Sequence, residues 1–328
     1  MYYKEWRKTM KKLLALFSLV AVFILTACGQ TTKTDATTTQ ATVEEKSEVT
    51  LTNGKEDVMV KTNPKKIVVF DLGVADTIRE LGFVDHIVGM PLKTLPAYLK
   101  DLPSSIQSTG SMVEPDIEAI AALEPDLIIA SGRTSKYLDQ LKEIAPTVIF
   151  SVDQKDYWTS VSKNIRLVAS LFGKEAEAKA EEEIKSLEAS IKKIADANEK
   201  SNDKTLTLML NEGKMSAFGA DSRFAFLYQS LKFKATDAKI EDSRHGQEMS
   251  FEGIKEINPD TIVLLNRTLA IGGDNSNADT VLNNELFKET NAVKNNRVLQ
   301  LTSDLWYLSG GGLQSTKLMI EDIQKVLQ

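Results

Sequence analysis

The chain has 328 residues, of which 42% are hydrophobic and 26% are charged, and its formal net charge is −6. A chain of this length and composition can fold into two globular lobes, and its acidic balance argues against general nucleic-acid binding. It contains one cysteine, Cys28, which excludes an intramolecular disulfide and a cysteine cluster for a metal ion.

The first 27 residues have the features of a secretory signal peptide. A basic stretch at 8–12 precedes an apolar run of fifteen residues at 13–27. This run is shorter than the roughly 20 residues that a membrane-spanning helix requires, and a short apolar run after basic residues is typical of a signal. Translation can begin at Met1 or at Met10.

The apolar run ends in Leu-Thr-Ala-Cys, which resembles the lipobox of bacterial lipoproteins. The resemblance implies that Cys28 is lipidated and becomes the first mature residue; an incidental cysteine in a signal cleaved elsewhere is the alternative. Two acyl chains suffice for stable anchoring, so we expect a Gram-positive-type lipoprotein on the outer face of the cytoplasmic membrane. Residues 28–50 are rich in threonine and predict a flexible tether.

Residues 51–153 predict an N-terminal lobe with a parallel sheet, because strand and helix patterns alternate along it. The predicted strands lie at 65–70, 86–90 and 147–152, the predicted helices lie at 71–82 and 135–144, and a further helix and strand share 116–130. The helix at 71–82 begins after Asp71 and stops at a glycine, as capped helices do.

The alternation stops at 154–202, which predicts connecting helices with apolar residues at helical spacing. Residues 203–328 then form the C-terminal lobe. Its predicted strands lie at 205–210, 214–218, 261–265 and 297–301, and its predicted helices at 222–231, 250–257 and 313–327. We therefore predict an α/β fold of two similar Rossmann-like lobes joined by a long, rigid helix.

A sequence repeat links the two lobes. Residues 117–133 (IEAIAALEPDLIIASGR) and 251–267 (FEGIKEINPDTIVLLNR) share six of seventeen residues at an offset of 134. Each copy predicts a capped short helix, a Pro-Asp stop, a buried strand and an arginine just past the strand. Ligands of open α/β sheets bind beyond the carboxyl ends of strands, so we expect Arg133 and Arg267 to face a shared cleft.

Three arginines are candidates for binding an anion. Arg223 lies in FGADSRF, at a turn that opens a helix, and joins Arg133 and Arg267. Converging guanidiniums bind anions well, because each is permanently charged and offers a planar fork of donors. A surface ion pair is the structural alternative for each arginine taken alone.

Several other residues could face a ligand. His245 lies in a polar loop, whereas the other histidine, His86, precedes a strand and is expected to be structural. Trp306 and Tyr307 follow the last strand, and either could be a core anchor instead. Three glycines at 310–312 can let a ligand approach the backbone or can serve a simple turn.

Glu118 and Glu252 occupy the first turns of the two repeat helices. The helix dipole favours a carboxylate there, which is a sufficient structural reason for both. The functional alternative is an acidic knob on the outer face of each lobe.

Motifs of hydrolases and nucleotide-binding enzymes are missing, since the sequence has no GxSxG, Walker or HExxH motif. A serine nucleophile remains an alternative, but a chain with two histidines and one cysteine can form few of the catalytic groups that hydrolases use. We therefore do not expect an enzyme.

Together these features resemble the iron-siderophore substrate-binding proteins of ABC importers. The resemblance covers 51–328 and rests on the lipobox, the tether, the KIVVFDLGVAD opening, the duplicated Pro-Asp units and the long helix. The motifs SGR, FGADSRF, HGQ, NR and LWYLSGGGL are similar to the branch that binds ferric catecholate siderophores, including petrobactin-type ligands. The loop after the second repeat is slightly longer than the family pattern. The implied fold is the helical-backbone, class III periplasmic binding protein.

The resemblance also implies roles for individual residues. The arginines that contact the anionic iron–catecholate centre align with Arg133, Arg223 and Arg267. His245 and Tyr307 would ligate the Fe3+ of the bound siderophore, and Tyr307 is preferred to Trp306 because a phenolate binds ferric iron and an indole does not. Glu118 and Glu252 would pair with arginines of a permease dimer.

The ferric siderophore is thus expected as the transported ligand of a monomer that has no intrinsic cofactor and no nucleic-acid partner. A haem- or cobalamin-binding lipoprotein of the same fold is the alternative within the class. Haem needs an axial Tyr or His and an apolar slot, whereas three arginines favour a compact anion. An adhesin or structural lipoprotein would show no convergence of arginines.

Overall fold

The computed structural model describes residues 47–52, 56–150, 152–241, 243, 245–274 and 276–325. The predicted signal peptide, Cys28 and most of the predicted tether lie outside the described residues. The described chain begins with an antiparallel pair of strands, β1 (Glu48–Thr52) and β2 (Asp57–Lys61). Strand β1 therefore begins inside 28–50, the range that the sequence predicts as tether.

The first sheet consists of five short parallel strands. Their order in the sheet is β5 (Gln107–Ser108), β4 (Ile87–Met90), β3 (Ile67–Val69), β6 (Leu127–Ala130) and β7 (Thr147–Ile149). Strands β3 and β6 are fully buried, as expected for central strands of a parallel sheet. The helices of this lobe are α2 (Leu72–Leu81), α3 (Ile117–Ala122) and α4 (Leu138–Lys142), with 3-10 turns η1 (Val84–His86), η2 (Ala97–Leu99) and η3 (Ser135–Tyr137).

The second sheet has six strands and is mixed. Its order is β11 (Gln247–Glu248), β9 (Lys214–Phe218), β8 (Lys204–Asn211), β12 (Thr261–Asn266) and β13 (Val298–Gln300), and β10 (Lys234–Ala235) pairs with β8. Strand β12 runs parallel to β8 and β13, whereas β8 and β9 form the antiparallel hairpin that the sequence predicts. Short helices cover it: α7 (Phe251–Ile257), α8 (Arg267–Ala270), α9 (Ser276–Leu282), α10 (Glu285–Lys288) and α11 (Asn291–Lys294).

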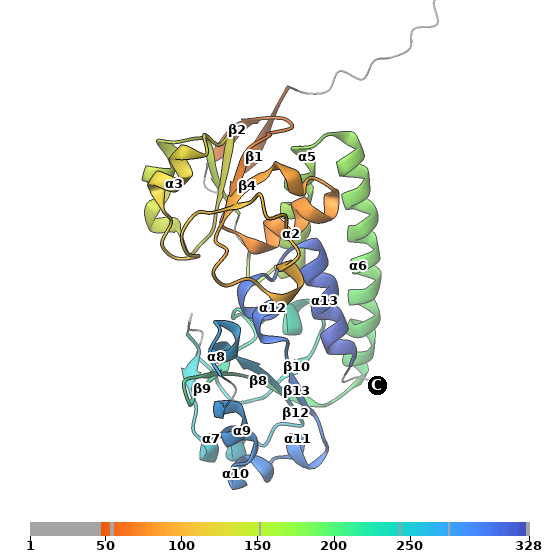
Figure 1. The fold of residues 1–328 in the computed structure, drawn as a ribbon. Helices are drawn as coiled ribbons and strands as arrows, with labels where there is room; N and C mark the ends of the chain where they lie inside the picture. The colour runs from red at the N-terminus through yellow and green to blue at the C-terminus, as the bar shows by residue number, and fades with distance from the viewer. Residues whose placement is uncertain are drawn as a thin grey trace, which may run out of the picture. The chain divides into compact units, whose positions relative to one another are not determined.

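Two helices, α5 (Tyr157–Ser170) and α6 (Lys174–Lys200), follow one another between the two sheets, as predicted. Helix α6 packs against α5, α2 and α13 (Leu313–Gln324), and Figure 1 shows it running along one side of the molecule. The main hydrophobic core extends from the first sheet through α5 and α6 to α13. Within the described part of the chain, no helix combines the length and apolar character needed to cross a membrane.

Helix α13 is attached to α2 by a buried carboxylate. Asp76 of α2 accepts hydrogen bonds from the backbone N of Gln314 at 2.9 Å and of Ser315 at 2.6 Å. These N–H groups belong to the first turn of α13, which has no partner for them within the helix. A Cβ at Gly312 would lie 2.2 Å from the Gly73 carbonyl oxygen. Gly312 therefore serves the close packing of two helices.

The two copies of the repeat are built alike. Asp116 and Ser250 cap α3 and α7 through their side-chain oxygens, which confirms the predicted caps. In the first copy, the Asp126 carboxylate accepts hydrogen bonds from the backbone just before β3. In the second copy, the Asp260 carboxylate accepts one from the first residue of β8. Each Pro-Asp turn thus also fastens the start of the neighbouring parallel strand.

The structure differs from the sequence prediction in several segments. The helix predicted at 222–231 is a turn followed by a π-helix, η4 (Phe226–Ser230), because burial of its aromatic side chains overrides a regular helical period. The strand predicted at 147–152 ends at Ile149, where its partner β6 also ends. Residues after the last strand form a helix that the sequence does not predict, α12 (Ser303–Leu308).

Candidate ligand-binding site

Three arginines and one tyrosine form a group that we call the arginine–tyrosine cluster: Arg133, Arg223, Arg267 and Tyr307. Arg133 follows β6, and Arg267 is the first residue of α8, directly after β12. Arg223 lies in the turn before η4, and Tyr307 lies on α12. All four residues are half-buried. The cluster therefore combines one arginine that follows a strand in each lobe with Arg223 and Tyr307 of the second lobe.

Each arginine contacts Tyr307. Nη2 of Arg133 donates a hydrogen bond to the Tyr307 carbonyl oxygen at 2.8 Å, and Nη2 of Arg223 donates to the same oxygen at 3.4 Å. Nε of Arg267 donates to the Tyr307 hydroxyl at 2.8 Å. The guanidinium carbons lie 5.8, 4.3 and 5.5 Å from the ring centre, in the order Arg133, Arg223, Arg267, which is within cation–π range.

The cluster carries positive charge that no carboxylate of the described residues neutralises by direct contact. Among the described residues, none of its three arginines forms an ion pair; the arginines that do are Arg79, Arg166 and Arg297. Burial lowers the pKa of Arg223, Tyr307 opposes this effect, and the charges of the other two arginines of the cluster lower it further. The alternative of ordinary surface ion pairs is therefore wrong for these three residues, and the site favours an anion.

The arginines also act on the phenol of Tyr307. Burial raises the pKa of Tyr307, but the hydrogen bond and the charge of Arg267, together with the charge of Arg223, outweigh burial. The pKa of Tyr307 consequently lies below its ordinary value of 10.0. A lowered pKa favours the phenolate, which is the form of tyrosine that can bind a metal ion.

Asp71 is a carboxylate close enough to Arg133 to interact with it electrostatically. It caps α2 by accepting hydrogen bonds from the backbone N of Gly73 at 3.0 Å and of Val74 at 3.1 Å. Burial raises the pKa of Asp71, while the Val74 hydrogen bond and the Arg133 charge lower it in part. The sequence identifies Asp71 as a cap but does not indicate its position beside the cluster.

Tyr307 and its neighbour Trp306 have different surroundings. Trp306 is 8% exposed, its indole Nε1 donates to the Asp322 carboxylate at 3.1 Å, and its ring centre lies 6.1 Å from that of Phe226. Consecutive side chains of a helix point about 100° apart, so α12 directs one residue into the core and the other toward the arginines. Trp306 is therefore a core anchor, whereas Tyr307 is half-buried, packs against the main core and also contacts the arginines.

The two histidines also differ. His245 is exposed in the loop before β11, where its backbone N donates to Ser243 Oγ at 3.3 Å. Its imidazole takes no part in the hydrogen bonds of the arginine–tyrosine cluster in the described chain. His86 bonds the Pro64 carbonyl oxygen through Nδ1 at 2.7 Å and packs edge-on against two phenylalanines. This confirms the structural role expected for His86, whereas His245 makes no hydrogen bond to the cluster within the described residues.

The remaining predicted residues lie apart from the cluster. Glu118 and Glu252 are exposed in the first turns of α3 and α7, at equivalent points of the two lobes. Across the described ranges, no three His, Cys, Asp or Glu side chains are placed to hold a metal ion. Asn211, which the sequence does not indicate, accepts a hydrogen bond from Arg267 Nη1 at 2.6 Å. An asparagine beside a hairpin turn is too common to be a signal of function.

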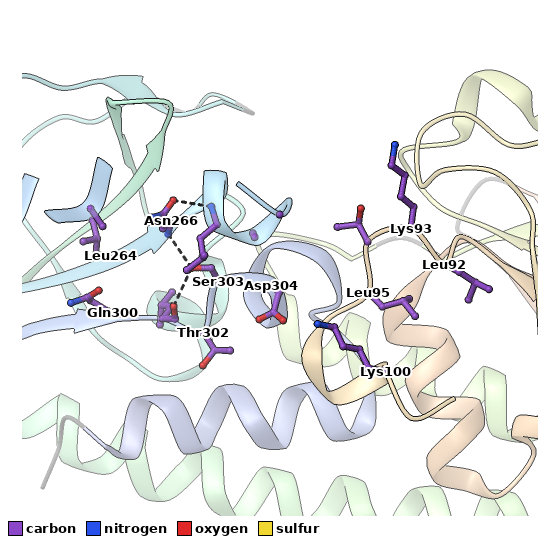
Figure 2. Close-up of a pocket in the computed structure, with 16 residues that line it drawn as sticks. Leu92, Lys93, Leu95, Lys100, Leu264, Asn266, Gln300, Thr302, Ser303 and Asp304 are labelled. Carbon is purple, nitrogen blue, oxygen red and sulfur yellow. Dashed lines mark hydrogen bonds between the residues drawn. The ribbon is translucent and has the colours of Figure 1, made fainter. Parts of the chain in front are cut away.

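A cavity of about 660 Å3 opens between a loop of the first lobe, 92–100, and the carboxyl ends of β12 and β13 (Figure 2). Lys93 and Lys100 line one side, and Asn266 and Asp304 line the other. The four residues of the arginine–tyrosine cluster do not line this cavity. Because its charges are of both signs and the charges of the cluster are of one sign, we assign the candidate anion site to the cluster.

Comparison with known sequences shows the family. Residues 67–305 match the model of the periplasmic binding protein family. Among characterised relatives, the petrobactin-binding protein YclQ of Bacillus subtilis (strain 168) is 37% identical over 323 residues, which cover 97% of this chain and 100% of YclQ.

Solved structures agree with the sequence match. The iron uptake ABC transporter substrate-binding protein PiuA from Streptococcus pneumoniae Canada MDR_19A is 62% identical, covers 86% of this chain and 99% of its own, and has a TM-score of 0.84. The periplasmic catecholate-siderophore binding protein VctP from Vibrio cholerae is 31% identical, covers 85% and 99%, and has a TM-score of 0.79. The resemblance to siderophore-binding proteins and the two-lobed α/β fold are thereby confirmed, and the chain belongs to the periplasmic binding protein family.

Proposed function

We propose that this chain binds a ferric catecholate siderophore at the arginine–tyrosine cluster and delivers it to an ABC import permease for iron uptake. The observation that carries the proposal is the convergence of Arg133, Arg223 and Arg267 on Tyr307 without a carboxylate partner among the described residues. The relatives YclQ and VctP, whose names state petrobactin and catecholate-siderophore binding, support it. The proposed role is binding and delivery, with no catalytic step.

The chemistry of the ligand matches the cluster. Ferric iron is a hard cation that prefers oxygen donors, and each catecholate supplies two negative oxygens. Complexes with two or three catecholates are therefore anionic, and charge-assisted hydrogen bonds from guanidiniums are well suited to them. Arg133 and Arg223 donate hydrogen bonds to the Tyr307 carbonyl, and a catecholate oxygen could accept from the same donors.

A bis-catecholate leaves two of the six coordination positions of iron open. We assign these positions to the Tyr307 phenolate and the His245 imidazole. The lowered pKa of Tyr307 supports the first assignment. The exposed loop position of His245, which leaves its ring accessible, supports the second.

Delivery requires an anchor and a docking surface. We propose that Cys28 is lipidated and holds the protein on the outer face of the cytoplasmic membrane, and that Glu118 and Glu252 pair with basic residues of the permease dimer. Support for the docking role comes from their exposure and their equivalent places in the two repeat copies.

The proposal is tested by titrating the intrinsic tryptophan fluorescence with ferric bis-catecholate, ferric hydroxamate and haem. Trp306 directly precedes Tyr307 and is therefore a suitable reporter. We expect tight binding of the catecholate complex and weaker binding of the other two. If haem or hydroxamate bound tightly and the catecholate did not, the proposed ligand class would be wrong.

Alanine variants of the three arginines test whether the ligand binds at the arginine–tyrosine cluster. Replacing Arg133, Arg223 or Arg267 by alanine should each weaken catecholate binding by about 1–3 kcal/mol, the worth of a hydrogen bond to a charged group. Arg166→Ala is the matched control, because Arg166 is paired with Glu181 on the surface of the connecting helices. Equal affinity of the wild type and all three cluster variants would place the ligand elsewhere.

The visible absorption spectrum of the bound complex tests which residues coordinate iron. Tyr307→Phe and His245→Ala should each shift the visible charge-transfer band of the bound bis-catecholate complex, since each removes one proposed ligand of iron. A tris-catecholate has no open position and should show no such shift. An unchanged bis-catecholate spectrum in either variant would remove that residue from the coordination sphere.

A further inference from the structure

Asn211 contacts the arginine–tyrosine cluster without carrying charge. Its Oδ1 accepts a hydrogen bond from Nη1 of Arg267 at 2.6 Å, while Nε of the same guanidinium donates to the Tyr307 hydroxyl at 2.8 Å. Two acceptors at different nitrogens of a planar group fix its orientation. The rest of the five N–H donors of the guanidinium stay available to a ligand.

The backbone next to Asn211 is hydrogen-bonded to α8, the helix that begins with Arg267. Asn211 is the last residue of β8 and precedes a two-residue hairpin turn. The turn residues, Glu212 and Gly213, both have positive φ, 52° and 83°, as tight hairpin turns of this length require. The backbone N of Glu212 donates to Thr268 Oγ1 at 2.8 Å, which fastens the turn to α8 beside Arg267.

The chemical type of the acceptor matters as much as its position. A carboxylate at 211 would orient the Arg267 guanidinium as well as an amide does, but it would form an ion pair with it and repel an anionic ligand. The amide oxygen of Asn211 accepts the hydrogen bond and brings no negative charge. Asn211 therefore does not reduce the positive charge that Arg267 presents to the ligand.

We propose that Asn211 is a positioning residue for the bound anion: it orients the Arg267 guanidinium while leaving its charge uncompensated, so that more negative ferric complexes are favoured. The inference rests on the proposed function, because it concerns the same site, and it adds the residue that selects the ligand by charge.

The test uses two ferric complexes of different charge. A ferric bis-catecholate is singly negative and a ferric tris-catecholate is triply negative. Both are titrated against the wild type, Asn211→Asp, Asn211→Ala and Asn295→Asp. The last variant is the matched control, because exposed Asn295 follows α11 and lies just before β13, at the amino end of the strands and away from the cluster.

We expect Asn211→Asp to weaken binding of the singly negative complex roughly tenfold and of the triply negative complex by a clearly larger factor, because Coulomb repulsion grows with ligand charge. Asn211→Ala should weaken both complexes by a similar, smaller factor, because it releases Arg267 without adding charge. Asn295→Asp should bind both complexes like the wild type. Thermal unfolding of each variant is measured alongside.

The inference is overturned if Asn211→Asp weakens both complexes equally and in step with a lower melting temperature, since that is what a purely structural residue does. Arg267→Ala, measured in parallel, separates the two claims. If Arg267→Ala weakens binding and the Asn211 variants do not, the role of Asn211 is wrong and the proposed function stands. If Arg267→Ala and Asn211→Asp both bind like the wild type, the proposed site itself is wrong.

Discussion

Replacing Asp76 by asparagine would test the buried carboxylate that joins α2 to α13. The Asp76 side chain is fully buried and accepts hydrogen bonds from the backbone N of Gln314 and Ser315 and from the Tyr98 hydroxyl at 3.3 Å. Burial raises the pKa of Asp76 from its ordinary value of 3.8 to about 6; hydrogen bonds from Ser315 and Gln314 offset part of the rise, and the charge of Glu80 adds to it.

The direction of the pH effect follows from this shift. Because the pKa is higher in the folded protein than in the unfolded chain, the folded state binds the proton more tightly. The protonated carboxyl of Asp76 therefore contributes stability that is fully present below about pH 4 and is lost as the pH rises through about 6. The shift corresponds to about 3 kcal/mol of unfolding free energy. Asparagine does not titrate and cannot lose this contribution.

The assay is urea unfolding of the wild type and Asp76→Asn at intervals from acid to neutral pH. The stability of the wild type minus that of the variant should fall by about 3 kcal/mol between about pH 4 and pH 7. Any constant penalty from the altered hydrogen bonds cancels in this comparison. Glu80→Gln should move the fall to lower pH, because it removes a charge that raises the pKa of Asp76. Parallel pH profiles for the wild type and Asp76→Asn would refute the reasoning.

Other predictions concern packing and hydrogen bonding. Gly312→Ala should cost about 1–3 kcal/mol of stability, because its Cβ would lie 2.2 Å from the Gly73 carbonyl oxygen. Gly82→Ala, at a φ of 98° with open space around it, should cost only about 1 kcal/mol; equal shifts in melting temperature for the two variants would contradict the packing argument. Asn198→Ala leaves the buried Leu231 carbonyl without the 2.7 Å hydrogen bond it accepts and should cost about 1–3 kcal/mol. An unchanged urea midpoint would show that this bond contributes nothing.

Sequence patterns among residues close in the chain determined much of the secondary structure. The caps of the repeat helices, the helix at 71–82 and the hairpin of β8 and β9 are predicted from sequence and found in the structure. Each depends on interactions among residues close in the chain, such as a side-chain cap or an alternating strand pattern. The two repeat copies also share a backbone conformation that side-chain patterns do not indicate. Glu124 and Asn258, each one residue before the proline of its copy, both have positive φ, 48° and 46°.

Where long-range packing decides the conformation, the prediction was wrong or incomplete. The segment 222–231 reads as a regular helix, but its aromatic side chains are buried and η4 winds as a π-helix. The glycines at 310–312 suggest a ligand or a turn, and Gly312 instead lets α13 approach α2. Neither contact is between residues near each other in sequence, so no local pattern contains it.

By itself, the sequence determined that this protein has two α/β lobes and that each repeat copy ends in an arginine, because periodicity and capping are local properties. Only the tertiary structure decided which side chains meet. It brings Arg133, Arg223 and Arg267 into contact with Tyr307. It also buries the adjacent Trp306 in the core and lets Asn211 accept a hydrogen bond from Arg267. The physical reason is that a binding site is an arrangement of groups from distant segments, and its charge depends on which of them lack partners once the chain has packed.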